Sequence, residues 1–329
     1  MRRLYLGLIG IVVVLAVYLV VLQLTSQYRA AGLFSFVGGL ATDQSGNIYV
    51  LDPKAKQIQK FDRNGDFILG WDTEATDVAI DSAGNIYAAE ETNHRVTKYS
   101  SSGAIIKQWG SRGSSSGQFE SPYDIAVDSD GVVFVADAYN NRIQAFNNEG
   151  QYLFDWGSQG RIGGNGSLNT PTSITIDSND NIYVLDQGNA QVQKFTKTEP
   201  ETNMSDCSGT NEVVPGICFV TKWSTSGTRG IAVDSQGDIY VADRVKIKKF
   251  ASDGILLKEF TEWHDENGRR WEAIQIEDVA IGEGNYVYVA DNYCYTILRF
   301  TNEGEYVSRF GSLRTVSIST EPPACAMIS

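Results

Sequence analysis

Histidine, cysteine, methionine and proline are all scarce in this chain of 329 residues. It has 2 His, 4 Cys, 3 Met and 7 Pro. Zinc sites need several His or Cys ligands at short spacing, and no such pair is present, so a zinc site is not expected. The motifs of serine hydrolases, zinc peptidases and phosphate-binding loops are also missing. With two imidazoles, the chain has few groups for acid–base catalysis at neutral pH.

Basic side chains are outnumbered as well. The net charge is −13, and residues 30–329 alone carry 24 basic against 40 acidic side chains, a net charge of −16. An acidic surface repels phosphate backbones, so we predict that the protein does not bind nucleic acid.

One long apolar segment stands at the start of the chain. Residues 4–24 contain a single polar side chain, Gln23. At about 1.5 Å per residue, a helix of this length crosses the roughly 30 Å hydrocarbon core of a bilayer. A cleaved secretory signal is the alternative, but its apolar region is usually shorter and a small-residue cleavage site follows it. Arg2 and Arg3 before the span favour a cytoplasmic N-terminus. We therefore predict residues 1–29 as a cytoplasmic tip, membrane anchor and linker, with the rest outside the cytoplasm, or secreted if the segment is cleaved.

The four cysteines fit an oxidising compartment. Cys207 and Cys218 bracket a short polar loop, and we predict a disulfide that closes it. The pairing of Cys294 and Cys325 cannot be derived from their positions.

A unit of about twelve residues occurs six times along the chain. The copies are residues 41–52, 79–90, 126–137, 175–186, 232–243 and 280–291. The acids that end them are 38, 47, 49, 57 and 48 residues apart, which is typical of four-stranded propeller blades. We predict an all-β, six-bladed β-propeller over residues 30–313, followed by a C-terminal tail at 314–329.

Alternation of apolar residues predicts four strands in each blade. In the third blade the expected strands are residues 124–127, 132–137, 141–146 and 151–156. An aromatic residue ends the third strand of every blade, and another ends the outer strand. These residues are Phe61, Tyr99, Phe146, Phe195, Phe250 and Phe300, then Trp71, Trp109, Trp156, Trp223, Phe260 and Phe310. We expect these rings to fill the space between neighbouring blades.

The repeated pattern resembles the NHL repeat family. An AVD-like strand, a GNIYVAD-like strand, an N-x-R-I-x-x-F strand and a W-G ending are most complete in the third blade, and ETNHRVTKY (91–99) contains an Asn-His pair. The resemblance covers about residues 38–313 and implies a six-bladed propeller used as an interaction platform. The fifth blade departs from the pattern after Asp243, where the connection is short, and the sixth has Gly282 in place of the first Asp. The extra stretch Phe34–Gly38 is expected to help close the ring.

Long links between blades share one face of a propeller with the loops between second and third strands. The link at residues 261–277 is the richest in recognition side chains. It contains Trp263, His264, Arg269, Arg270 and Trp271. Exposed aromatic residues beside Arg are common on binding surfaces, so these five residues are candidate ligand contacts. The alternative is a solvated loop whose two Trp pack against the blades.

The first residue of each inner strand is expected to line the mouth of the central channel. Going round the ring, these residues are Gly39, Asp77, Asp124, Ser173, Gly230 and Asp278. Tyr123, Arg229 and Glu277 come directly before three of them, and we count Tyr123 and Arg229 as ligand contacts. Three converging carboxylates, Asp77, Asp124 and Asp278, are a candidate Ca²⁺ site. The alternative is that each Asp accepts hydrogen bonds from backbone N–H groups at a strand start.

Two functions from different classes follow. The first is a membrane-anchored binding or scaffolding module that presents its loop-rich face to a protein, peptide or glycan at the cell surface. The second is a Ca²⁺-dependent hydrolase or lyase with its site at the channel mouth. Propellers similar to the resembled family include amidating lyases, which depend on several His, and lactonases. The chain has too few His for the former chemistry. His94 stands at a repeat position held elsewhere by Lys56, Asn141, Ala190 and Tyr295, so we expect it to be structural.

Overall fold

The computed structural model describes most of the predicted propeller. The described residues are 32–157, 164–198, 212–226, 229–261, 264 and 275–313. The predicted anchor at residues 4–24 and the tail at 314–329 lie outside them. Within the described ranges, no helix has the length and apolar character needed to cross a membrane.

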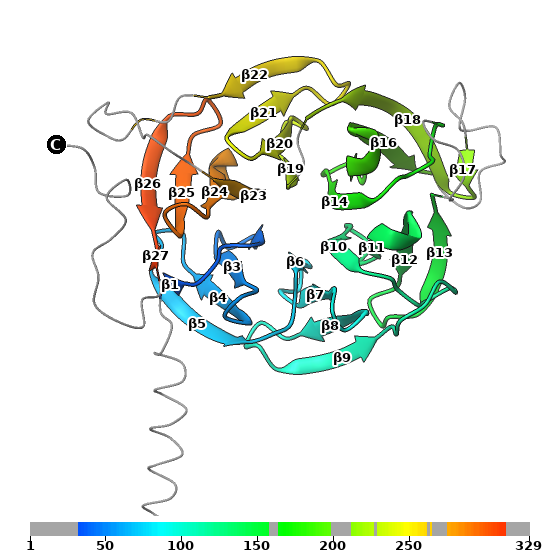
Figure 1. The fold of residues 1–329 in the computed structure, drawn as a ribbon, viewed down its shortest axis with the longest axis horizontal. Helices are drawn as coiled ribbons and strands as arrows, with labels where there is room; N and C mark the ends of the chain where they lie inside the picture. The colour runs from blue at the N-terminus through cyan, green and yellow to red at the C-terminus, as the bar shows by residue number, and fades with distance from the viewer. Residues whose placement is uncertain are drawn as a thin grey trace, which may run out of the picture.

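Six sheets are arranged in a ring around a common centre in the part of the chain that the structure describes (Figure 1). The antiparallel strands follow one another outward in sequence order, except that the fourth sheet has a fifth strand, β17 (Glu212–Val214), outside β18 (Ile217–Ser224). The innermost strands are β2 (Leu40–Thr42), β6 (Asp77–Ile80), β10 (Pro122–Val127), β14 (Pro171–Ile176), β19 (Ile231–Val233) and β23 (Ile276–Ile281). The second strands are β3 (Ile48–Asp52), β7 (Ile86–Glu90), β11 (Val133–Asp137), β15 (Ile182–Asp186), β20 (Ile239–Asp243) and β24 (Val287–Asp291).

The outer halves of the sheets complete the predicted six blades. The third strands are β4 (Gln57–Phe61), β8 (Arg95–Tyr99), β12 (Arg142–Phe146), β16 (Gln191–Lys197), β21 (Lys246–Phe250) and β25 (Thr296–Phe300). The outer strands are β5 (Phe67–Asp72), β9 (Ile105–Trp109), β13 (Tyr152–Trp156), β18 (Ile217–Ser224), β22 (Leu256–Phe260) and β26 (Tyr306–Phe310). Short elements add to this frame: β17 (Glu212–Val214) pairs with β18, and the 3₁₀ turns are η1 (Ala138–Asn140), η2 (Gln187–Asn189) and η3 (Glu283–Asn285).

Burial falls from the second strand of a blade to its outer strand. Every residue of β3, β7, β11, β15 and β24 is buried. Four of the five residues of β9 and of β22 are exposed. Because neighbouring blades cover both faces of a second strand, its sequence is a continuous apolar run such as IYVLD.

The predicted packing of aromatic rings between blades is confirmed. The ring that ends one outer strand lies against the ring that ends the third strand of the next blade. The ring-centroid distances are 6.0 Å for Trp71–Tyr99, 6.1 Å for Trp109–Phe146, 5.4 Å for Trp156–Phe195, 5.9 Å for Trp223–Phe250 and 4.9 Å for Phe310–Phe61. The last pair joins the sixth blade to the first, so the ring is closed by the same contact that joins its members.

The stretch before the first blade closes the ring, as expected. β1 (Leu33–Phe34) pairs in parallel with β27 (Ser312–Leu313), which follows the last outer strand. Arg112 and Phe119 form an equivalent parallel bridge in the link between the second and third blades. The closing contact is therefore an ordinary link that is divided between the beginning and the end of the propeller.

In four of the blades, the acid that ends the repeat accepts a hydrogen bond from a backbone N–H of the link entering its own blade. The backbone N–H of Ser35 donates to Asp52 (2.6 Å), and that of Glu120 donates to Asp137 (2.8 Å). Asn169 and Gln275 donate in the same way to Asp186 and Asp291, at 2.7 and 3.0 Å. These strongly repeated carboxylates are therefore part of the scaffold.

Candidate functional site at the channel mouth

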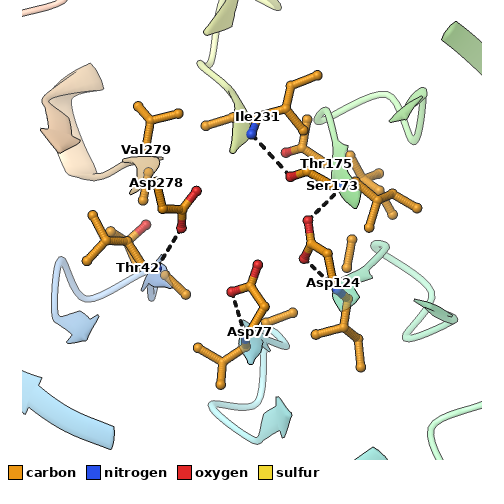
Figure 2. Close-up of a pocket in the computed structure, with 18 of the residues that line it drawn as sticks. Thr42, Asp77, Asp124, Ser173, Thr175, Ile231, Asp278 and Val279 are labelled. Carbon is orange, nitrogen blue, oxygen red and sulfur yellow. Dashed lines mark hydrogen bonds between the residues drawn. The ribbon is translucent and has the colours of Figure 1, made fainter. Parts of the chain in front are cut away.

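The inner strands begin at two stacked rings of residues. The neck ring consists of the six predicted channel residues, Gly39, Asp77, Asp124, Ser173, Gly230 and Asp278. The mouth ring lies one residue earlier in each blade and consists of Gly38, Thr76, Tyr123, Thr172, Arg229 and Glu277. Figure 2 shows Asp77, Asp124 and Asp278 pointing into the channel from three different blades.

A cavity lies on each side of the neck ring. The mouth pocket has a volume of about 140 Å³ and is lined by all six mouth-ring residues, with Phe36, Gly39, Pro53, Asp77 and Asp278. The channel below has a volume of about 270 Å³ and is lined by residues of all six inner strands. Phe36 belongs to a link and Pro53 to the connection between β3 and β4, so the pocket opens on the predicted loop-rich face.

The neck carboxylates bond to backbone N–H groups of the inner strands. Asp124 accepts hydrogen bonds from the N–H of Ile125 and from that of Ile174 in the next blade, the latter at 2.7 Å. Asp278 accepts from the N–H of Leu40 in the first blade (2.7 Å). These bonds support the capping alternative and also join neighbouring blades. Ser173 continues the pattern, since the N–H of Ile231 donates to its Oγ at 3.2 Å.

Asp77 differs from the other two acids in its partners. It accepts from its own neighbour, the N–H of Val78, at 2.7 Å. Unlike the bonds from the Leu40 and Ile174 N–H groups, this bond stays within its own blade.

Two glycines make room for the carboxylates of the next blade. A Cβ atom on Gly39 would lie 2.6 Å from Asp77 Oδ1, and one on Gly230 would lie 1.8 Å from Asp278 Oδ1. Any side chain at these ring positions would displace the acid beside it. Where one blade has an Asp at the neck and the blade before it has a Gly, the Gly is therefore required by packing.

The pKa values of all three neck acids are raised. Burial raises the pKa of Asp77 well above its usual range, and the charges of Asp124 and Asp278 raise it further. Burial, followed by the charge of Asp124, does the same to the pKa of Asp278. The pKa of Asp124 is raised by burial, against the lowering effect of its hydrogen bonds. Among the described residues, no Lys, Arg or His forms an ion pair with these three acids.

The mouth ring contains one ion pair of its own. Arg229 Nη1 lies 2.8 Å from Glu277 Oε2, and Gln275 donates to the other oxygen of Glu277 at 2.9 Å. Tyr123 lies on the same rim with 39% of its surface exposed. Thr172 is only 6% exposed, and its Oγ1 has no hydrogen-bond partner in the described part of the chain.

The structure brings together part of the predicted site. Tyr123, Arg229, Asp77 and Asp278 line one pocket, and Asp124 lines the channel directly below. His264 is half-buried in the 261–277 link, while Trp263, Arg269, Arg270 and Trp271 lie outside the described residues. The role of this link in binding stays a prediction.

Some lining residues were missed, and the repeat position of His94 is confirmed. Thr172, Thr76 and Phe36 carry no motif. The register of the inner strands could have located the two Thr residues, whereas Phe36 belongs to a link. His94 occupies the backbone position expected from the repeat. It has a φ of 52°, within the range of 51–56° found at Lys56, Asn141, Ala190 and Tyr295. The N–H of Ser121 donates to His94 Nδ1 at 3.4 Å, as the N–H of Thr170 donates to Asn141 at 2.8 Å.

The neck does not match a Ca²⁺ site. Calcium takes 6–8 oxygen ligands, and four of the six carboxylate oxygens here already accept hydrogen bonds from backbone N–H groups. Within the described ranges, no group of three or more His, Cys, Asp or Glu side chains is arranged to hold a metal ion. The assignment of Asp77, Asp124 and Asp278 to calcium stays a prediction, and we derive no metal-dependent step from it.

Of the four cysteines, the structure describes two. Cys218 and Cys294 are both disulfide-bonded. Cys207 and Cys325 lie outside the described residues, so the predicted Cys207–Cys218 bond is not tested.

Comparison with known proteins agrees with this fold. The family model described as "NHL repeat" matches residues 119–146 and 168–195. None of the curated proteins matches the sequence. A streptogramin B lyase structure is similar, with 16% identity over 86% of this chain and 84% of that chain and a TM-score of 0.57. The virginiamycin B lyase of Staphylococcus aureus has 17% identity over 85% and 86%, with a TM-score of 0.55. A gluconolactonase of Xanthomonas campestris has 13% identity over 80% and 85%, with a TM-score of 0.56. At such low identity these similarities show the fold alone.

Proposed function

Since this chain is an NHL-repeat six-bladed β-propeller, we propose that it is a membrane-anchored, extracytoplasmic binding module that holds its ligand at the channel mouth. The ligand is a protein, a peptide or a glycan. The single observation that carries the proposal is the mouth pocket, where six blades contribute one residue each to an open cavity of about 140 Å³. A cavity in which polar groups from several elements converge is the usual form of a ligand site.

The composition of the rim supports ligand binding over a purely structural role. Tyr123 and Arg229 belong to the residue types that dominate binding hot spots, and both are accessible. The Arg229–Glu277 pair holds its charges on the rim, where they can orient an incoming polar group. Residues that serve only the scaffold are buried and recur from blade to blade, whereas the six mouth-ring residues are of five different types.

The proposed location rests on the sequence. Residues 4–24 are long and apolar enough for an anchor, and the basic residues before them favour a cytoplasmic N-terminus. A propeller that follows such a segment is held outside the cytoplasm, where the cysteines can form disulfides.

A Ca²⁺-dependent hydrolase or lyase is the second candidate. The convergence of three carboxylates at the neck favours it, and two of the proteins with a similar fold are named as lyases. The oxygens engaged by backbone N–H groups count against it. The binding module is therefore the better supported function.

One experiment tests both the location and the mouth site. The full-length chain, with an epitope tag after residue 329, is expressed on its native cells. We expect antibody to label intact cells, and deletion of residues 4–24 to release the protein into the medium. Ligand is then captured from the native cell surface and its affinity measured for wild type, Tyr123→Ala, Arg229→Gln and the control Lys258→Ala, which alters the outer edge of the fifth blade.

We expect each mouth substitution to weaken affinity at least tenfold, which corresponds to about 1.4 kcal/mol. The control variant should bind as wild type does, and thermal unfolding of every variant checks that it is folded. Labelling that requires permeabilised cells would refute the external location. Equal affinities for the mouth variants and the control would refute the mouth as the binding site.

A further inference from the structure

The distribution of charge at the mouth is unbalanced. Four carboxylates, Asp77, Asp124, Asp278 and Glu277, face one cation, Arg229, within the described residues of the two rings. Arg229 is engaged by Glu277 at 2.8 Å. The three neck acids therefore have no cation of their own there. Burial raises the pKa values of Asp77 and Asp278, and the charges of neighbouring acids raise them further.

The free space of the pocket lies beside two of these acids. Gly38 and Gly39 leave the first blade without a side chain in either ring. Asp77 of the second blade and Asp278 of the sixth flank this gap, and both line the mouth pocket. A group that enters the pocket over Gly39 therefore meets a carboxylate on each side.

A second feature of the pocket is independent of the acids. Thr172, on the opposite side of the ring, lines the same pocket and has a buried hydroxyl without a partner among the described residues. Leaving a buried polar group unsatisfied costs about 1–3 kcal/mol, so a hydrogen bond from a polar group of a ligand would stabilise this side of the pocket. Phe36, Pro53 and Tyr123 add apolar surface around the entrance.

From this geometry we infer that the mouth pocket binds a primary ammonium group of its ligand between Asp77 and Asp278, above Gly39. The inference rests on the proposed binding function and names the ligand chemistry of that site. An ammonium group carries three N–H donors and one positive charge, which suits a few carboxylate and hydroxyl oxygens. A Ca²⁺ ion needs more oxygens than these side chains leave available. The pocket of about 140 Å³ accommodates an amine on a short alkyl chain, and the apolar rim residues contact its methylene groups.

The test uses n-butylammonium as a probe and isothermal titration calorimetry on the full-length chain in detergent. The uncharged probe n-butanol, the anion butyrate and Ca²⁺ are titrated in parallel. We expect one n-butylammonium site per chain at millimolar concentration, and no measurable binding of n-butanol or butyrate.

Two variants test the carboxylates, and one serves as a matched control. Asp278→Asn removes the charge but keeps an oxygen for the Leu40 N–H, and we expect it to weaken n-butylammonium binding at least tenfold. Gly230→Ala leaves every charge in place but displaces Asp278, and we expect a similar loss. Glu149→Gln removes an exposed acid on the outer edge and should bind as wild type does. Thermal unfolding shows whether each variant is folded, and binding is compared among the folded ones.

The outcomes separate this inference from the proposed function. Absence of n-butylammonium binding to wild type would overturn the inference, and so would equal binding by Asp278→Asn and Glu149→Gln. In either case the mouth remains the ligand site if Tyr123→Ala still loses the native ligand. Ca²⁺ binding that is lost in Asp278→Asn, without any amine binding, would also overturn the inference and would favour the metal-dependent enzyme.

Discussion

The two ends of the inner strands differ in how far the six blades agree. At the mouth end, the neck ring reads Gly, Asp, Asp, Ser, Gly and Asp, and the mouth ring is more varied still. At the far end, four blades share one arrangement, which we call the turn unit. It consists of an Asp in the turn after the inner strand, a Tyr on the second strand and a Lys on the third.

The contacts of the turn unit hardly vary. The Tyr hydroxyl donates to the Asp at 3.0–3.1 Å in the pairs Tyr49–Asp43, Tyr87–Asp81, Tyr183–Asp177 and Tyr240–Asp234. The Lys ammonium lies 4.9–5.2 Å from the centre of the same Tyr ring in each case. A residue pattern that recurs with the same contacts in successive blades serves the scaffold.

The third blade shows what happens when the turn unit is incomplete. Phe134 stands in place of the Tyr and Ala145 in place of the Lys, so Asp128 loses both partners. Lys197 of the fourth blade reaches across and lies 2.6 Å from Asp128 and 2.8 Å from Asp130. At the far end a departure from the pattern is compensated within the protein, whereas at the mouth the departures leave a pocket. This difference is our reason for assigning scaffold to one end and binding to the other.

The largest expected effect comes from a ring shared by the blades. Trp156 is 2% exposed and lies between Phe134 of its own blade and Phe195 of the next. Trp156→Ala should lower the free energy of unfolding by about 3–5 kcal/mol, because it leaves a cavity between two blades. Tyr123→Ala at the mouth should cost less than about 1 kcal/mol, since its side chain is partly exposed. Urea denaturation measures the free energy of unfolding of both variants. Equal losses would contradict the assignment of Trp156 to the scaffold and Tyr123 to the binding site.

A smaller effect is expected from the compensating lysine. Asp128 has a fully buried side chain, so Lys197→Met leaves a buried carboxylate without its ion pair. We expect a loss of about 1–3 kcal/mol in the free energy of unfolding. Lys258→Met removes an exposed pair with Glu303 and should change it by less than about 0.5 kcal/mol. If the two substitutions cost the same, Lys197 does not replace the missing partners of the third blade.

The smallest expected effect is a change of stability with pH. Its sign differs between the neck ring and the turn unit. Because the pKa of Asp77 is raised in the folded state, stability is lost as the pH rises from the usual Asp value through the raised one. Asp77→Asn removes this loss, so the variant should exceed wild type in Tm by about 2–4 °C at pH 8, on the order of 1 kcal/mol, and match it near pH 4.

Asp43 provides the opposite arm of this test. Burial raises its pKa, but hydrogen bonds from Asn47 and Tyr49 and the charge of Lys60 lower it more, so the net shift is downward. Its contribution to stability is present above the usual Asp value and is lost as the pH falls below it. Asp43→Asn should therefore be less stable than wild type at pH 8 and approach it in acid. Thermal unfolding at both pH values measures the two differences, and curves of the same sign would contradict the comparison.

Much of the fold could be predicted because the sequence contains six copies of the blade repeat. The spacing of Asp52, Glu90 and their equivalents located the blades, and the alternation of apolar residues located the strands. The first and last residues of the propeller were harder to interpret. Phe34 belongs to a link whose other half lies after Phe310, and only closure of the ring brings the two halves together.

The candidate site was predicted less completely. The neck acids were found because they occupy an equivalent position in each blade, and their convergence followed from the ring. Their hydrogen-bond partners did not follow. Asp278 bonds to Leu40, which is 238 positions away in the chain, and Asp124 bonds to Ile174 of the next blade. The closeness of Gly230 to Asp278 and the unsatisfied hydroxyl of Thr172 have no signal in the sequence.

The sequence by itself determined the repeating blade, the number of blades and the residues that enter the channel, because each depends on local periodicity and on the need of every blade to bury both faces. The tertiary structure alone decided which carboxylates accept hydrogen bonds from backbone N–H groups, which of them lie without a cation and where a pocket is left open. These properties depend on contacts between neighbouring blades, and residues in such contact lie tens to hundreds of positions apart in the chain.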